Sequence, residues 1–409
     1  MLELDLVETL AFGGLALLSG YALCRFIPVL GRYNIPPPVI GGLLVALAIL
    51  LARGQGVTLF SFDTTLQSPL MIAFFTTIGF GASLSLLKIG GPQVLRFFII
   101  ATVFAVFQNI IGVLVAIPFG LDPLFGVLAG SVTLTGGPAT GLAFAPLFEE
   151  AGVPAAASVA VAVAMGGIVL GGLIGGPVST FIIERHRLRA TPAASENRSS
   201  AAAAAQARAL ENSEEAAVDD EEPNILPVLR NLVVILVAMW AGSWLGRGFE
   251  ALGLTLPAYI GAMLVAALVR NLDDVTGWFG LSHRFINHFG AVALSMFLVL
   301  ALMTLKLWEL ATLALPLITI LIVQTACVVL IALWPTFGLM GRNYEAAVMS
   351  GGFIGFMLGT TANAMAVMRA LVERYGPAPR AFLVAPMVGA FFIDFTNAII
   401  VTVFLNIFG

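Results

Sequence analysis

Two stretches rich in glycine and threonine interrupt apolar sequence, and their residue types suit the binding of small ions. The first reads TLTGGPATG over residues 133–141, and the second reads GFMLGTTAN over residues 355–363. Glycine allows the backbone to approach a ligand closely, and threonine hydroxyls can coordinate a cation or bond a carboxylate. A half-helix that begins at such a break favours an anion at its N-terminal end, whereas unwound carbonyls favour sodium.

The candidate ligand residues of these stretches combine backbone freedom with polar side chains. They are Thr133, Thr135, Gly136, Gly137, Thr140, Gly355, Gly359, Thr360, Thr361 and Asn363. The alternative is that the small residues serve close helix packing alone. Two such stretches at matched positions of a repeated sequence favour ligand binding.

Asp394 is an acidic residue inside the apolar stretch GAFFIDFTNAII. A carboxylate within a membrane span is costly unless it is paired or hydrated, so the first hypothesis for Asp394 is a functional role. It can neutralise a substrate ammonium group or coordinate sodium, and Asn397 follows three residues later on the same helix face. The structural alternative is a partner on another helix, for which Arg369 is a candidate.

Amide side chains recur at a second pair of matched positions. Gln108 and Asn109 lie in one apolar segment, and Gln324 and Thr325 take the matching place in another. Amides in membrane spans commonly bond to neighbouring helices. Helix bonding and ligand binding remain equal alternatives here, and Asn109 joins the candidate binding residues. The candidate sodium ligands are Asp394, Asn397, Thr135 and Thr361.

The composition requires a membrane around these residues. The chain has 409 residues, of which 59% are hydrophobic and 10% are charged. A soluble domain carries roughly 25% charged residues, so a solvated surface does not fit this inventory. The formal net charge of -4 gives no indication of nucleic-acid binding. We therefore predict an all-α polytopic membrane protein.

About ten transmembrane helices are expected, since a helix needs roughly 20 apolar residues to cross a bilayer. The predicted limits are 6–28, 38–53, 69–88, 97–118, 156–183, 225–247, 256–270, 290–307, 311–337 and 382–406. Two moderately apolar segments remain, at about 124–150 and 344–371, and they contain the glycine- and threonine-rich stretches. Irregular backbone at membrane depth is tolerated only inside protein or along a watery cavity. We expect both segments to be re-entrant loops.

The chain also reads as one unit written twice. Ile40-Gly41 matches Ile260-Gly261, and Leu44-Val45-Ala46 matches Leu264-Val265-Ala266. The predicted domains are an N-terminal repeat at 1–183, a flexible linker at 184–224 and a C-terminal repeat at 225–409. Five spans per repeat invert one repeat relative to the other. Glycine-interrupted segments at matched positions of inverted repeats indicate a secondary transporter.

Basic residues predict the orientation of these repeats in the membrane. The linker region carries Arg185, Arg187, Arg189, Arg198 and Arg208, which place it in the cytoplasm. Both termini are then outside, in the periplasm of a cell whose inner membrane holds the protein. The two re-entrant loops then enter from opposite sides, which is the geometry of alternating access.

Along nearly the whole chain apart from the linker, the sequence resembles the bacterial sodium/glutamate symporters of the glutamate:sodium symporter family. The matching stretches are IPPPVIGGLLVALAIL, PLMIAFFTTIG, QNIIGV, GLDPLFGVLAGSVTLTGG, LGGLIGGPV, LKLWELATLALP, ERYGP and FLVAPMVGAFFIDFTNA. The resemblance implies two inverted halves with a pore loop in each, and sodium-coupled uptake of L-glutamate. It also implies a homodimer whose transport core moves against a scaffold, with sodium as the coupling ion and no cofactor.

The loops depart from the family pattern at a few positions. A GGxGT-like motif is usual in the first loop, but here Ala139 replaces the expected glycine and Pro138 lacks an N–H donor. The second loop usually resembles GFGLGAT, and here it contains Met357. The residues carried over by position are Thr135, Gly136, Gly137, Thr140, Gly355, Gly359, Thr361, Asp394 and Asn397. The departures put the exact substrate in question more than the fold or the coupling.

Other function classes are weighed against this one. A sodium symporter for another small anion or amino acid shares every feature above. An ion channel that uses the two loops as a selectivity filter is a further alternative, and it would conduct without saturation. An intramembrane enzyme is disfavoured, because the predicted spans hold no Ser/His or Cys/His pair and the chain has no HExxH.

Overall fold

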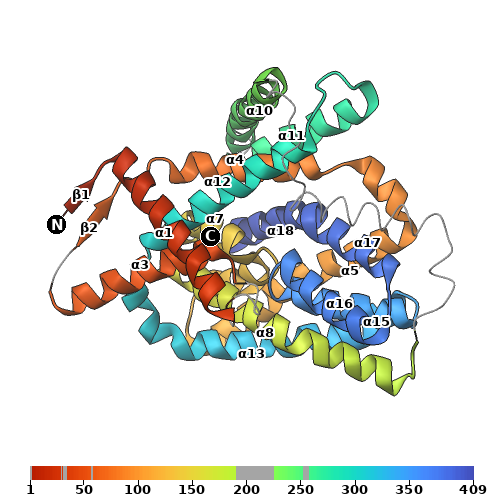
Figure 1. Cartoon of the computed structure of the whole chain (residues 1–409). Helices are drawn as coiled ribbons and strands as arrows, with labels where there is room; N and C mark the ends of the chain where they lie inside the picture. Colours follow the sequence, from red (N-terminus) through yellow and green to blue (C-terminus); the bar gives the residue numbers. More distant parts are fainter. Residues whose placement is uncertain (1, 29, 31–34, 57–58, 190–224, 252–257) are drawn as a thin grey trace.

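The computed structural model describes residues 2–28, 30, 35–56, 59–189, 225–251 and 258–409, and this part of the chain is almost entirely helical (Figure 1). Two three-residue strands, β1 (Leu2–Leu4) and β2 (Phe60–Phe62), pair in parallel and are a small departure from the all-α expectation. The predicted linker lies outside the described residues from position 190 onward.

The helices of the first half follow the predicted order. They are α1 (Leu6–Phe26), α3 (Pro37–Gly54), α4 (Gln67–Gly81), α5 (Leu84–Ala116), the turn η1 (Ile117–Phe119), α6 (Pro123–Val127), the π-helix η2 (Leu128–Val132), α7 (Gly137–Glu150) and α8 (Ala156–Arg185). Local signals set several starts. Asp5 and Glu8 form a capping box at α1, and the Asp122 side chain accepts from the Leu124 N–H at α6.

The second half of the chain is also helical and has more interruptions. Its elements are α10 (Ile225–Ala251), α11 (Ala258–Thr276), α12 (His283–Met303), η4 (Leu307–Leu313), α13 (Ala314–Ile331), η5 (Ala332–Thr336), α14 (Phe337–Leu339), α15 (Tyr344–Met357), α16 (Thr361–Tyr375), α17 (Pro379–Met387), η6 (Val388–Phe392) and α18 (Ile393–Phe408).

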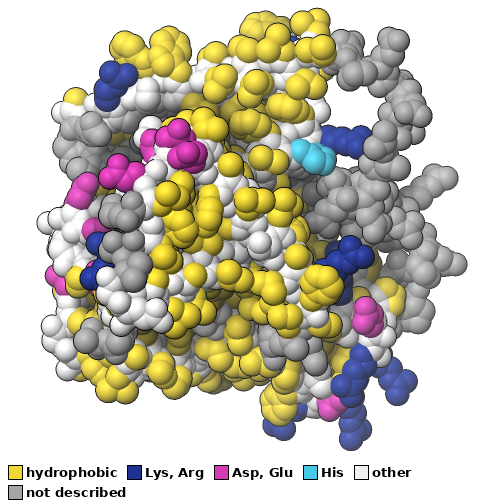
Figure 2. All heavy atoms as spheres, turned by 60° about the vertical axis from the view of Figure 1, so that its left-hand side comes forward, with side chains coloured by type: hydrophobic (Ala, Val, Ile, Leu, Met, Phe, Trp, Pro, Cys, Tyr) yellow, Lys and Arg dark blue, Asp and Glu magenta, His cyan; other side chains and the backbone are white. Residues whose placement is uncertain are grey.

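Seven stretches of the described chain are long and apolar enough to cross a membrane. They are Leu6–Phe26, Pro37–Gly54, Gly91–Phe119, Ala156–Arg185, Ile225–Phe249, His283–Met303 and Ala314–Leu339. The protein is therefore a polytopic membrane protein. On the face shown in Figure 2, apolar side chains form a broad surface, and charged side chains gather toward the upper left and the lower right.

Three of the ten predicted spans do not meet these criteria. The predicted limit at residue 88 is wrong, because the chain leaves helical geometry at Ala82 and Ser83 and α4 has only 15 residues. The span at 256–270 continues as α11 to Thr276 and collects charged residues at its end. The span at 382–406 is not one helix, because the π-helix η6 divides it into α17 and the 16-residue α18.

The helices form two groups that are visible in Figure 1. The flanking group consists of α1, α3, α4, α10, α11 and α12, in the upper and left parts of the view, and the central group consists of α5 to α8 and α13 to α18. The most extensive helix contacts, such as α4 with α11 and α15 with α16, join members of the same group. The largest hydrophobic cluster lies mainly in the central group.

Each half begins with the same close helix crossing. In the first half, a Cβ atom on Gly41 of α3 would lie 2.1 Å from the carbonyl oxygen of Ala16 in α1. In the second half, a Cβ atom on Gly261 of α11 would lie 2.2 Å from the carbonyl oxygen of Gly242 in α10. Only glycine permits backbones this close. Gly41 and Gly261 are the residues that the sequence comparison of the two halves aligned.

Candidate functional site

Both glycine- and threonine-rich stretches are breaks between two helices. The first break, residues 133–136, separates η2 from α7, and the second break, residues 358–360, separates α15 from α16. Gly137 begins α7 with a φ of +68°, a left-handed conformation that favours glycine. Thr360 is the N-cap of α16, and its hydroxyl accepts from the Asn363 N–H at 3.3 Å.

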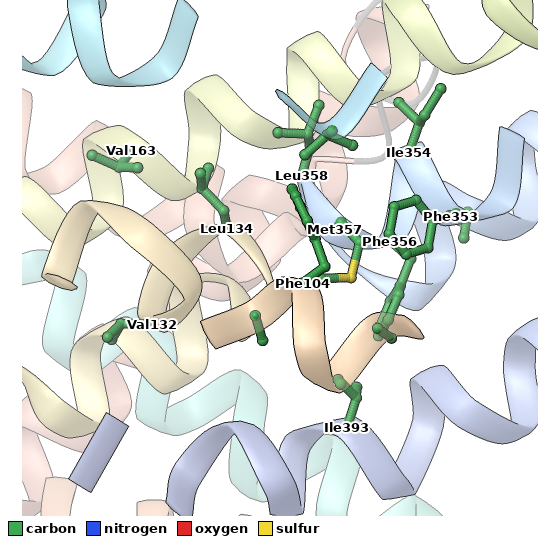
Figure 3. Close-up of a cluster of buried hydrophobic side chains, with 14 of the residues drawn as sticks. Phe104, Val132, Leu134, Val163, Phe353, Ile354, Phe356, Met357, Leu358 and Ile393 are labelled. Atoms are coloured by element: carbon green, nitrogen blue, oxygen red, sulfur yellow. The ribbon is translucent and has the colours of Figure 1, made fainter. Parts of the chain in front are cut away.

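The two breaks meet in the interior of the protein. A Cβ atom on Gly137 would lie 3.4 Å from the Gly359 carbonyl oxygen and 3.5 Å from Cγ2 of Thr360. Figure 3 shows Leu134 of the first break beside Leu358 of the second. The N-terminal ends of α7 and α16 therefore converge, although more than 200 residues separate them in the sequence.

Converging helix N-termini give this place a positive electrostatic character. The first turn of a helix presents N–H groups that have no partner within the helix, and the helix dipole adds to their effect. Pro138 falls in the first turn of α7, where its missing N–H does not break the helix. The arrangement suits an anionic group held by backbone N–H donors.

Gln108 of α5 links the two breaks through its side chain. Its Oε1 atom accepts from the Thr135 hydroxyl at 2.5 Å, and its Nε2 atom donates to the Met357 carbonyl at 2.9 Å. Its own carbonyl accepts from Nε2 of Gln324 in α13 at 2.6 Å. The amide pairs that recur in the two halves thus contact each other, as the helix-bonding alternative expects.

Ser131 ties the first break to two helices from opposite halves. Its N–H donates to Oδ1 of Asn109 in α5 at 2.8 Å, and its carbonyl accepts from Nδ2 of Asn397 in α18 at 2.9 Å. At the second break, the Nδ2 atom of Asn363 donates to the Ile168 carbonyl of α8 at 3.0 Å and to the Gly355 carbonyl of α15 at 3.4 Å. The last helix of each half therefore holds the break of the other half.

Within the described part of the chain, several side chains around the breaks have a buried polar atom that lacks a hydrogen-bond partner. These atoms are Nδ2 of Asn109, Oγ of Ser131, Oε1 of Gln324, Oδ1 of Asn363 and Oδ1 of Asn397. Buried polar groups in native proteins are normally hydrogen-bonded, so each of these atoms needs an explanation. Such atoms around the breaks can bond an ion or a substrate.

Asp394 lies one helical turn before Asn397 and is partly buried. Among the described residues, no hydrogen-bond donor or basic side chain contacts its carboxylate. Arg369, the candidate structural partner, is exposed on α16. The π-helix before Asp394 touches the second break, because a Cβ atom on Gly389 would lie 2.7 Å from Oγ1 of Thr361. Asp394 thus places an acidic side chain close to the breaks.

Some predicted residues have structural contacts instead of open polar atoms. The Thr133 hydroxyl donates to the Leu128 carbonyl at 2.8 Å. Gly355 allows α15 and α16 to pack closely, since a Cβ atom there would lie 2.9 Å from the backbone of Ala364. Met357 points into the hydrophobic cluster of Figure 3, with Phe104 and Leu358. The packing alternative therefore describes part of each stretch.

Two residues at this place were not among the sequence-based candidates. Ser131 lies two residues before Thr133, in the π-helix that leads to the first break, and its only sequence signal is a hydroxyl within that segment. Tyr259 of α11 is fully buried, stacks on Phe75 of α4 and meets Phe144 of α7 edge-on. No local pattern distinguishes Tyr259 from a membrane-interface tyrosine.

A cavity of about 380 Å³ lies between α7 and the end of α12. Its lining includes Leu142, Ala145, Glu149, Ser158, Thr304 and Lys306. The α7 residues that line the cavity, from Leu142 to Glu149, lie toward the C-terminal end of the helix that begins at the first break.

Comparison with known proteins agrees with this geometry. The family model described as sodium/glutamate symporter matches residues 2–377. A protein named sodium/glutamate symporter from Escherichia coli (strain K12) is 40% identical over 412 residues, which covers 99% of this chain and 98% of that protein. One of the same name from Haemophilus influenzae is 38% identical, over 97% of this chain and 96% of its own length. This chain belongs to the sodium/glutamate symporter family.

Proposed function

We propose that this protein transports L-glutamate together with sodium across the bacterial inner membrane by alternating access. The observation that carries the proposal is the convergence of the two breaks close to the segment that carries Asp394, in a chain of this family. The names of its relatives supply the substrate and the coupling ion.

The site divides into an anionic and a cationic subsite. Substrate carboxylates meet the first-turn N–H groups of α7 and α16, together with the hydroxyls of Thr140 and Thr361. Sodium binds to unwound carbonyls at the breaks and to Asp394, with Asn397 and Thr135 as further candidate ligands. Asn109 orients the first break and offers its unpaired Nδ2 atom to the substrate.

Charge compensation couples the two solutes. With sodium and substrate both bound, the positive charges of sodium and of the N-terminal ends of α7 and α16 offset the negative charges of Asp394 and of glutamate, and the site can cross the membrane. With only one bound, the crossing leaves an uncompensated charge in a low-dielectric surrounding, which is strongly unfavourable. This difference suppresses movement of either solute alone.

The inverted-repeat topology is part of the proposal. The matched glycine crossings at Gly41 and Gly261 support it, as do the contacts from the last helix of each half to the break of the other. The segments at 124–150 and 344–371 enter the membrane from opposite sides, the termini are periplasmic, and the linker at 184–224 is cytoplasmic.

The two helix groups suggest how access alternates. The central group holds both breaks, and it moves as an elevator-type core against the flanking group. A homodimer joined through flanking groups would hold this scaffold still in the bilayer; this assembly is implied by the family resemblance.

Uptake of labelled L-glutamate into proteoliposomes tests the proposal, with an inward sodium gradient against an equal potassium gradient. We expect saturable accumulation with sodium and none with potassium.

Asp394→Asn, in protein whose folding is verified by its thermal unfolding, should lose sodium-dependent accumulation. Normal sodium-dependent uptake by this variant would remove Asp394 from the account.

The runner-up is a sodium symporter for another small anion or amino acid, which Pro138, Ala139 and Met357 keep open. Competition of labelled glutamate with an unlabelled panel separates the two, because the preferred substrate competes at the lowest concentration. A channel is distinguished by a flux that does not saturate.

A further inference from the structure

Four buried polar atoms that lack a hydrogen-bond partner among the described residues belong to side chains around one short backbone segment, residues 130 and 131 of η2. They are Nδ2 of Asn109, Oγ of Ser131, Oε1 of Gln324 and Oδ1 of Asn397. All four residues are 0% exposed, so bulk water does not satisfy these atoms. Because buried polar atoms are normally hydrogen-bonded, four of them around one segment indicate a shared partner.

The bonded atoms of two asparagines place their side chains at this segment. Oδ1 of Asn109 accepts from the Ser131 N–H at 2.8 Å, and Nδ2 of Asn397 donates to the Ser131 carbonyl at 2.9 Å. The oxygen and the nitrogen of an amide are attached to the same carbon atom. Nδ2 of Asn109 and Oδ1 of Asn397 therefore lie near the backbone that also carries Oγ of Ser131.

Gln324 of α13 reaches the same segment through Gln108. A Cβ atom on Gly130 would lie 3.0 Å from the Gln108 carbonyl oxygen, and that oxygen accepts from Nε2 of Gln324 at 2.6 Å. Each of the helices that supply these side chains, α5, α13 and α18, contacts η2. The four unpaired atoms thus come from elements that pack against one another.

The chemistry of this cluster favours a cation. Three of the four unpaired atoms are oxygens with lone pairs. Ser131 lies in the last turn of the helical run Pro123–Val132, where the carbonyl end of the helix dipole is negative. The run also leaves helical geometry at Gly130, with a φ of -99° and a ψ of -129°. Unwound backbone at the C-terminal end of a half-helix is a place where sodium binds in transporters.

We propose that Ser131, Gln324 and Asn397 ligate one sodium ion through Oγ, Oε1 and Oδ1, at the C-terminal end of the half-helix formed by α6 and η2. This inference rests on the proposed function, because it assigns ligands to its sodium subsite. Ser131 and Gln324 are additional to the candidate ligands named above. Nδ2 of Asn109 is a donor and does not ligate the ion.

This ligand set connects sodium binding with substrate binding. Ser131 belongs to the first half of the chain, whereas Gln324 and Asn397 belong to the second, so the ion joins the two halves. Sodium at Ser131 also fixes the N–H group that orients Asn109, whose Nδ2 atom is offered to the substrate. Bound sodium therefore prepares the first break for glutamate, which lowers the ordering cost of substrate binding.

Thermal unfolding of the purified full-length protein in detergent tests the ligand set. Wild type and Ser131→Ala are titrated with NaCl at constant ionic strength, with choline chloride as the balancing salt and no glutamate. We expect the sodium concentration for half-maximal stabilisation to rise about tenfold in the variant. The melting temperature in choline should not fall, since the Ser131 hydroxyl makes no hydrogen bond to a described residue.

Gln324→Met tests a second ligand independently. The variant keeps a side chain of similar length and loses Oε1, so it should also need about ten times more sodium. Its melting temperature in choline should fall, because the bond to the Gln108 carbonyl is lost as well.

Ser179→Ala is the matched control. The Ser179 hydroxyl is also buried without a hydrogen-bond partner among the described residues, but it lies elsewhere, 2.5 Å from the position of a Cβ atom on Gly351 of α15. Its loss should leave the sodium dependence that of wild type.

Three results would overturn the site. If sodium stabilises wild type and both ligand variants match it within twofold, the ligand set is wrong and the proposed function stands. A lower melting temperature of Ser131→Ala in choline, with the sodium dependence of wild type, would assign these atoms to a buried water. Weaker glutamate binding by both variants at saturating sodium, again with an unchanged sodium dependence, would assign them to the substrate. A wild-type protein that responds to neither sodium nor glutamate overturns the proposed function as well.

Discussion

At the residue scale, the site is built from amide side chains that use one atom for the fold and leave the other unpaired. Asn109, Asn363 and Asn397 each bond a backbone group near a break, and each keeps one buried polar atom that has no hydrogen-bond partner among the described residues. The bonded atom fixes the orientation of the side chain. The position of the other amide atom is therefore also fixed before a ligand binds. Such preorganisation reduces the ordering cost of binding.

Gln108→Leu should separate the two breaks without changing the size of the buried side chain greatly. The variant loses the bonds to Thr135 and Met357 and leaves the Met357 carbonyl without this donor. We expect a loss of about 1–3 kcal/mol of stability and a lower apparent affinity for glutamate. Thermal unfolding and proteoliposome uptake measure the two effects.

Ser350→Ala is the control for Gln108→Leu, because the Ser350 hydroxyl is buried but bonds only within its own helix, to the Ala346 carbonyl. Its uptake should match wild type. An unchanged glutamate affinity in Gln108→Leu would show that the link between the breaks does not position the substrate.

At the element scale, each break is a helix start that requires a particular backbone. Gly137 adopts a φ of +68°, and its neighbour Pro138 then starts α7 with a fixed φ. A Cβ atom at Gly137 would find ordinary contact distances, so conformation and not space demands glycine there.

Gly137→Ala should therefore cost about 1–2 kcal/mol, the usual cost of a left-handed conformation with a Cβ atom. We expect a lower melting temperature and weaker substrate binding, because the first turn of α7 shifts. Gly14→Ala in α1 is the matched control, since nothing lies within 4 Å of its Cβ position. Equal melting temperatures for the two variants would contradict the claim that the left-handed conformation at residue 137 requires glycine.

The connection from α4 to α5 leads from the flanking group into the central group, and Asn271 of α11 forms hydrogen bonds with it. Asn271 donates to the Ala82 carbonyl at 2.9 Å and accepts from the Leu84 N–H at 2.9 Å. Nearby, burial would raise the pKa of Asp273, but N–H donors of Leu281, Phe279 and Gly280 outweigh it and hold that pKa below its ordinary value. The hydrogen bonds of Asn271, and those from the loop after α11 to Asp273, are therefore kept at neutral pH.

Asn271→Ala removes both bonds to the connection. We expect faster amide hydrogen exchange at residues 82–91, where Gly91 already has a φ of +64°, while exchange in α15 and α16 is unchanged. Asn231→Ala serves as the control. Asn231 of α10 bonds Ser282 and Pro227 and does not bond the connection between α4 and α5 among the described contacts. Unchanged exchange at 82–91 would show that Asn271 does not hold the connection.

At the scale of the whole molecule, helices from the two halves interleave in both groups. In the flanking group, α3 packs on α12 and α11 packs on α4, and in the central group α8 packs on α15 and α16. Neither half can bury its apolar surface alone in this arrangement. The two halves are therefore expected to fold as one cooperative unit, with the site formed only when both are present.

The proposed orientation predicts the accessibility of single cysteines. In a background without Cys24 and Cys327, we expect Gln55→Cys to react with an impermeant maleimide in intact spheroplasts. Ser199→Cys, in the predicted linker, should react only after the membrane is permeabilised. The reverse pattern would invert the topology, and labelling of both in intact spheroplasts would contradict the cytoplasmic linker.

Residue types alone predict the membrane class, most of the helices and the two stretches that contain the breaks. Hydropathy is set by the residues themselves, and glycine and threonine together weaken a helix in apolar sequence, so the stretches 133–141 and 355–363 could be located without coordinates, whereas the bounds of the breaks inside them could not. The end of α4 at Gly81 and the π-helix before Asp394 could not, because their residues are as apolar as the spans around them.

Which polar atoms meet depends on the tertiary structure. The bond from Thr135 to Gln108, the bond from Asn397 to Ser131 and the bond from Asn363 to Ile168 join segments that lie apart in the sequence. Side-chain type predicts that a buried polar atom needs a partner, but the packing of the helices determines which atom that partner is. The composition of the site was therefore predictable in outline, and its connections were fixed by how the two halves interleave.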